Sequence, residues 1–73
     1  MKKGTRVFVK WWDIQAYVQH DEPIDPILTE CVGWVERDTK TVLELTYCRY
    51  TDKTKFRDGI VMPKGCVESV EEI

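Results

Sequence analysis

The chain has 73 residues and a formal net charge of −2. A chain this short forms one domain over residues 1–73, because it has too few residues for a second hydrophobic core. Its negative charge disfavours a dedicated nucleic-acid-binding protein, since neutralising phosphates requires a basic surface. The apolar run after the basic start is short and is interrupted by Lys10. We therefore expect neither a signal peptide nor a membrane span, and we predict a cytoplasmic protein.

The charged residues are arranged in blocks along the chain. Residues 13–30 contain five acids and no base, and residues 37–57 contain six bases and three acids. Residues 66–73 contain three acids and no base. Such blocks are typical of solvated loops and strand faces. They are also consistent with a dipolar molecule that associates head to tail or docks a partner of mixed charge.

The first predicted strand covers residues 5–12. Its β-branched and aromatic residues alternate between two faces, one with Val7, Val9 and Trp11 and the other with Phe8, Lys10 and Trp12. Residues 13–26 are polar and contain two prolines, and a residue that precedes proline is disfavoured in a helix. We expect a long loop there, with a short strand at residues 15–19 as an alternative within it.

Four further strands are predicted, at residues 27–36, 41–50, 59–62 and 67–73. The first two of these are separated by four polar residues, which predicts an antiparallel hairpin. A terminal helical turn is the alternative to the strand predicted at residues 67–73. Five short strands would leave exposed edges in a flat sheet, so we predict closure into a small barrel.

The chain from Gly59 to Val67 contains a short strand, Pro63, a tight Lys-Gly-Cys turn and the start of a last strand. This pattern resembles the closing segment of Src-homology-3-like barrels, in which proline ends one strand and sets the turn. The resemblance implies a mainly β, five-stranded Src-homology-3-like small barrel with a long loop after the first strand. Peptide-binding members carry a tyrosine three residues after the proline, where this chain has Cys66, so we do not expect recognition of proline-rich peptides.

Three stretches carry a second likeness: Val9-x-Trp11-x-Asp13, Gly33-Trp34-Val35 and Pro63-Lys64-Gly65-Cys66-Val67-x-Ser69-Val70-Glu71-Glu72-Ile73. They are similar to a group of short proteins that bacteriophages and prophages encode and that typically end in an Ile-Pro-Lys-Gly-like segment. This resemblance implies a phage accessory protein that works in the cytoplasm of a bacterial host. It implies no site residues.

Residues suited to catalysis or metal binding are sparse. The three cysteines are odd in number and form no Cys-x-x-Cys pair, so we interpret them as small buried hydrophobic residues that stay reduced. The only histidine, His20, stands beside Asp21 and Glu22. Neighbouring loop residues rarely converge on one ion, and no second histidine completes a tetrahedral site. We predict a protein that is not an enzyme and that holds no metal or cofactor.

The first candidate binding surface is the outer face of the first strand. Phe8 and Trp12 lie there, and large aromatic side chains are costly in water unless something covers them. Residues 13–26 are one candidate cover, and a subunit or partner interface is the other. Trp11 shares its face with valines and is expected in the core. The pattern assigns Trp34 to neither face.

The second candidate surface mixes aromatic and basic residues near the end of the hairpin. Its members are Tyr47, Arg49, Tyr50, Lys53, Lys55 and Arg57. Such mixtures suit single-stranded nucleic acid or a nucleotide with a stacked base, although a solvated hairpin end is the simpler interpretation. Lys64, beside Gly65, offers an ammonium and a backbone N–H to an anion.

Three functional hypotheses follow from these surfaces. The leading one is a non-enzymatic binding module that engages a host or phage protein. A binder of a nucleotide or single-stranded nucleic acid, with sequestration as a counter-defence role, is the first alternative. A structural homo-oligomer is the second, because association stabilises β domains whose cores are small. We expect a protein partner, self-association and no contact with membranes.

Overall fold

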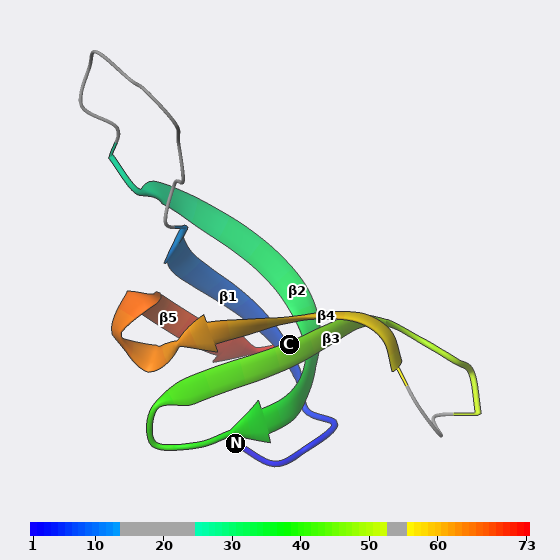
Figure 1. Cartoon of the computed structure of the whole chain (residues 1–73). Helices are drawn as coiled ribbons and strands as arrows, with labels where there is room; N and C mark the ends of the chain where they lie inside the picture. The colour runs from blue at the N-terminus through cyan, green and yellow to red at the C-terminus, as the bar shows by residue number, and fades with distance from the viewer. Residues whose placement is uncertain (14–24, 53–55) are drawn as a thin grey trace.

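The computed structural model describes residues 1–13, 25–52 and 56–73, apart from the side chains of Arg49, Phe56 and Arg57. It contains five strands, β1 (Arg6–Asp13), β2 (Ile27–Asp38), β3 (Val42–Arg49), β4 (Phe56–Pro63) and β5 (Val67–Glu72), and a three-residue 3-10 helix η1 (Lys64–Cys66) between β4 and β5. All strand pairs are antiparallel, and the strand order is β4-β3-β2-β1-β5 (Figure 1). The prediction of a mainly β domain with five strands is confirmed.

The strand bounds differ from the predicted ranges by one or two residues, except at the start of the fourth strand. The fourth strand begins at Phe56 rather than at residue 59, because its pairing with β3 continues past an irregularity near Cys48. Residues 67–72 form a strand, so the alternative of a terminal helical turn is wrong. Most of the long loop predicted at 13–26, and the whole of the alternative strand at 15–19, lie outside the described residues.

The sheet is open along two edges. The strand order places β4 at one edge and β5 at the other, and each pairs with a single neighbour. Closure into a barrel therefore stays a prediction. Within the ranges that the structure describes, no helix has the length and apolar character needed to cross a membrane.

One face of the curved sheet forms the hydrophobic core. Because side chains alternate across a strand, residues of β1, β2, β3 and β4 that project to the same side form this face. The fully buried members are Val7, Val9, Val35, Leu43, Leu45 and Met62. Trp11 packs against this cluster, as its position beside the two valines of β1 predicted.

The long strand β2 belongs to both halves of the sheet. It pairs with β1 up to Trp34 and with β3 from Trp34 onward, and it bends strongly between these two regions (Figure 1). Gly33 lies at this bend. A Cβ atom at this position would stand 2.7 Å from the carbonyl oxygen of Thr46 on β3. Only glycine allows such an approach of two backbones, so Gly33 permits the crossing.

The strand register assigns Trp34, the residue after this glycine, to one face of the sheet. It stands opposite Arg6 on β1 and opposite Thr46 on β3, so it projects to the outer face, and it is half-buried. Thr46 is buried although it also projects to this face. The bend of β2 therefore gives the outer face a sheltered region at the junction of the two halves.

The bend at Gly33 leads to a first prediction. We expect Gly33→Ala to lower the free energy of unfolding by about 1–3 kcal/mol, because the added methyl group must displace backbone rather than a flexible side chain. Urea denaturation measures this loss. Gly65→Ala is the matched control, since nothing lies within 4 Å of its added Cβ, and it should change stability by less than about 0.5 kcal/mol. Equal midpoints for the two variants would contradict the close approach.

Candidate functional site

A patch of exposed apolar side chains covers the outer face of β1 and β2. The register sets Phe8 opposite Val32 and Trp12 opposite Leu28. Directly opposed residues project to the same side of a sheet, so these four side chains form one surface, which we call the Trp12 face. Trp12, Leu28 and Val32 are 41%, 45% and 49% exposed, and Phe8 is half-buried. The structure thus brings the two predicted aromatic residues together with two aliphatic residues that the sequence analysis did not single out.

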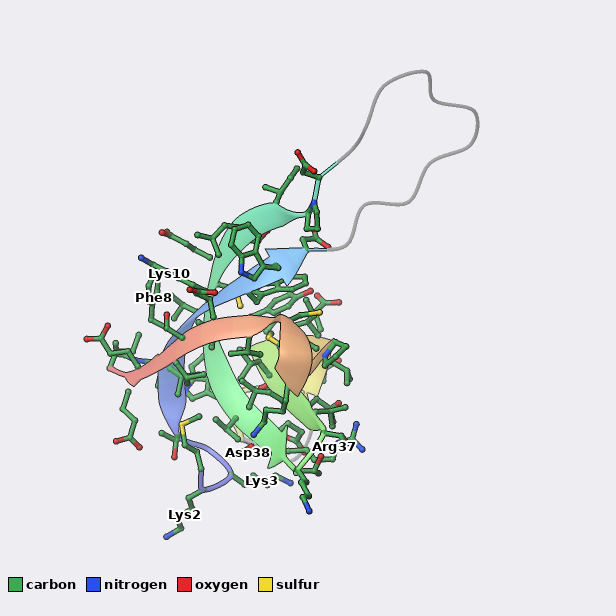
Figure 2. All side chains as sticks on the ribbon, turned by 90° about the vertical axis from the view of Figure 1, so that its left-hand side faces the viewer. Lys2, Lys3, Phe8, Lys10, Arg37 and Asp38 are labelled. Atoms are coloured by element: carbon green, nitrogen blue, oxygen red, sulfur yellow. The ribbon has the colours of Figure 1, made fainter. Side chains whose placement is uncertain are left out.

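Charged residues run through and beside the Trp12 face. Lys10 projects from β1 next to Phe8 (Figure 2) and stands opposite Glu30 on β2. On its other side β1 meets β5, where Glu71 is opposite Phe8 and Ser69 is opposite Lys10. The face therefore combines an apolar surface with charged groups that solvent reaches. The register places the Lys10–Glu30 pair between the Trp12–Leu28 and Phe8–Val32 pairs, and such a mixture of apolar and charged side chains occurs in protein interfaces.

Trp12 is held in place by a hydrogen bond to β5. Its indole Nε1–H donates to Oε2 of Glu68 at 2.9 Å. The single donor of the indole is satisfied in this way, so the exposed part of the ring offers only apolar and aromatic contacts. Coverage of Trp12 by residues 14–24 lies outside what the structure describes, but the side chain is exposed.

The second candidate surface is described only in part. Tyr47 and Tyr50 are both exposed. Arg49 and Arg57 lie on β3 and β4, but their side chains are among those not described, and Lys53 and Lys55 lie outside the described residues. The grouping of these aromatic and basic side chains therefore stays a prediction.

The exposure of Tyr47 has a local cause. The alternation along β3 assigns it to the same face as Leu43 and Leu45, which are fully buried. The pairing with β4 is irregular between Thr46 and Cys48, at the position of Tyr47 itself. A bulge of this kind redirects side chains and interrupts the alternation.

Lys64 is engaged in an ion pair rather than free for an anion. Its Nζ lies 2.5 Å from Oδ1 of Asp38, and Oδ2 of Asp38 contacts the amino group of Met1. Lys64, and to a smaller extent the Met1 amino group, lower the pKa of the Asp38 carboxyl by donating hydrogen bonds to it. The pair connects η1 to the end of β2. Sequence reasoning missed it, because nothing in the pattern links two residues so distant along the chain.

The three thiols are free and differ in exposure. Cys31 and Cys66 are half-buried, whereas Cys48 is exposed, so the prediction of burial is wrong for Cys48. It stands on β3 opposite Asp58, beyond the part of the sheet that the core covers. Burial raises the pKa of the Cys31 thiol; the nearby indole N–H of Trp11 acts in the opposite direction, although its geometry falls short of a hydrogen bond.

The described part of the chain contains no group of three or more His, Cys, Asp or Glu residues that could hold a metal ion. His20, Asp21 and Glu22 lie outside it. Comparison of the chain with family models, with curated proteins and with solved structures finds no match in any of the three. The function must therefore be argued from the surfaces of the molecule.

The ion pair of Asp38 predicts a pH-dependent stability. A carboxyl whose pKa is lower in the folded state stabilises the fold above its ordinary pKa of about 4, and this contribution is lost as the pH falls through the folded value. We expect Asp38→Asn to lower the urea midpoint near neutral pH and to match the wild type once the carboxyl is protonated. Asp58→Asn, at an exposed acid on β4, is the control and should follow the wild type at every pH. A gap between Asp38→Asn and wild type that stays constant with pH would contradict the role of the ion pair.

The different environments of the three thiols predict the order in which alkylation modifies them. The thiolate is the reactive form, so a half-buried thiol with a raised pKa should react slowly. When iodoacetamide is added at mildly alkaline pH, we expect Cys48 to be modified first and Cys31 to be modified later. Peptide mass spectrometry measures the modification of each cysteine. Denaturation in urea should remove the difference. Equal rates in the native protein would contradict the burial of Cys31.

Proposed function

We propose that the chain is a non-enzymatic protein-binding module and that the Trp12 face is its binding surface. The observation that carries the proposal is the exposure of Trp12, Leu28 and Val32 on one face of two paired strands. Apolar side chains that cluster on the surface of a soluble domain mark sites of interaction. Tryptophan in particular is enriched among the residues that dominate binding energy.

The geometry of the Trp12 face supports this role. The side chains stand on β1 and β2, which pair with each other along the whole of this face, from Phe8 opposite Val32 to Trp12 opposite Leu28. The hydrogen bond to Glu68 restrains the indole of Trp12, so little side-chain freedom is lost when a partner binds. Lys10 and Glu30, between the two apolar pairs, and Glu71, beside Phe8, provide charges that select among partners.

The class of the module and its biological setting are part of the proposal. The strand order β4-β3-β2-β1-β5 and the helix η1 directly after Pro63 support a Src-homology-3-like small barrel. The similarity of three sequence stretches to phage-encoded proteins supports an accessory protein of a phage or prophage that acts on a protein in the bacterial cytoplasm.

The alternative of a nucleotide or nucleic-acid binder receives less support. Of its candidate residues, the structure places only the side chains of Tyr47, Tyr50 and Lys64. Lys64 is paired with Asp38, so its charge is already compensated. The Trp12 face, by contrast, is described in full.

The role of Trp12 can be measured directly. A partner captured from a bacterial lysate on the immobilised chain is identified by mass spectrometry, purified and titrated by calorimetry. We expect Trp12→Ala to weaken this complex by about 30-fold, which corresponds to about 2 kcal/mol. Val61→Ala is the matched control, because Val61 is equally exposed but lies on β4 at the opposite edge of the sheet, and it should change affinity less than about twofold.

Two outcomes would contradict the proposal. If Trp12→Ala binds the purified partner as Val61→Ala does, the Trp12 face is not the binding surface. If the captured partner is the chain itself and light scattering shows an oligomer that Trp12→Ala dissociates, the face is a contact between subunits. Thermal unfolding verifies that each variant folds, and Leu28→Glu replaces Trp12→Ala if the latter does not.

A further inference from the structure

The strand β5 offers a free edge to a partner. Among the described residues it pairs only with β1, and all its residues from Glu68 to Glu72 are exposed. A strand at a sheet edge has one row of backbone N–H and C=O groups without strand partners. Extended segments of other proteins bind at such edges by adding a further strand.

The hydrogen-bond pattern identifies which backbone groups point outward. The amide of Ile73 donates to the carbonyl of Arg6 at 3.0 Å, which makes these two residues a hydrogen-bonded pair of the β1–β5 ladder. Hydrogen-bonded pairs alternate along an antiparallel ladder, so Glu71 and Ser69 also direct their backbone groups toward β1. Val70 and Glu72 therefore direct theirs outward at the free edge.

The charge of β5 selects what can pair with it. The strand carries Glu68, Glu71 and Glu72 and no base, and none of these acids forms an ion pair with another described residue. Opposite charges across a ladder stabilise a strand pair, whereas like charges directly opposite destabilise it. Glu71 lies on the side of the sheet that carries Phe8, and an added strand with lysine or arginine on that side meets this requirement.

A second copy of the chain does not meet this requirement for opposite charge beside β5. Antiparallel pairing of β5 with itself centred on Val70, whose backbone groups point outward, would set Glu68 opposite Glu72 and would repeat this repulsion by symmetry. The other free edge, β4, contains one base and one acid and ends in Pro63, so it offers β5 no net opposite charge. The edge therefore favours a strand from a different, basic protein.

We propose that the outer edge of β5 accepts an extended segment of a partner protein in which basic residues alternate with apolar ones. The basic side chains lie beside Glu71, on the side of the sheet that carries Phe8, and the apolar ones lie beside Val70, on the side of Val9. The added strand takes its hydrogen bonds from the backbone of Val70 and Glu72. This site rests on the backbone and charge of β5, so it goes beyond the Trp12 face and does not depend on it.

A peptide of four Lys-Val repeats, capped at both ends, is the probe. Isothermal titration at low salt should show binding that weakens as salt is added, because the charge contribution is screened. Val70→Pro removes the outward N–H of β5 while leaving the ladder to β1 intact, and Val70→Ala removes the side chain but keeps the N–H. We expect Val70→Pro to bind about tenfold more weakly than Val70→Ala, as loss of an edge hydrogen bond predicts.

Amide hydrogen exchange locates the added strand. On addition of the Lys-Val peptide, exchange should slow at Val70 and Glu72, whose amides point outward, and should change little at Ser69 and Glu71, which already bond to β1. If Val70→Pro does not fold, Glu72→Pro with Glu72→Ala as its control repeats the comparison at the other outward amide. Trp12→Ala should bind the peptide as wild type does, so failure of this site and failure of the Trp12 face are distinguishable.

Three results would overturn the proposal. Equal binding of a Lys-Val peptide whose amides are methylated would show attraction of charge alone, without strand addition. Binding of a Glu-Val peptide of the same length would show that the acids of β5 do not select the partner. Equal affinity of Val70→Pro and Val70→Ala, both folded, would show that the peptide binds elsewhere.

Discussion

The close approach of β2 to β3 at Gly33 is the constraint on which the rest of the structure depends. Because this residue has no Cβ, the backbone of β2 passes within reach of the Thr46 carbonyl, and one strand can continue from one half of the sheet into the other. The valines of β1 and the leucines of β3 then face the same core. A small domain obtains in this way a continuous buried cluster from strands that are each short.

The same arrangement determines which surfaces remain for binding. With β1 and β2 paired to each other, their outer face presents Trp12, Leu28 and Val32 on one surface. With β5 last in the strand order, its backbone and its glutamates stay exposed next to that face. The Trp12 face and the outer edge of β5 thus lie next to each other, and both follow from one strand order. A partner with both an apolar surface and a basic extended segment could engage them together.

Local rules succeeded where one strand keeps its alternation. Trp11 and Trp12 are neighbours in sequence, yet one packs against the core and the other is exposed, as the period of two predicted. Tyr47 is exposed although the alternation along β3 sets it with Leu43 and Leu45, because an irregular pairing with β4 interrupts the alternation there. The burial expected of Cys48 failed for a related reason, since β3 continues beyond the core and residue type alone does not locate its end.

The amino-acid sequence by itself determined the class of fold, the number of strands and the two aromatic residues of the outer face, because these follow from periodicity and from proline and glycine positions within short windows. Only the tertiary structure decided that Leu28 and Val32 join those aromatics, that Lys64 is paired with Asp38, and that β5 is an edge. Each of these depends on the register and order of strands far apart in the chain. Register and order are set by the packing of the whole sheet, and no local pattern contains them.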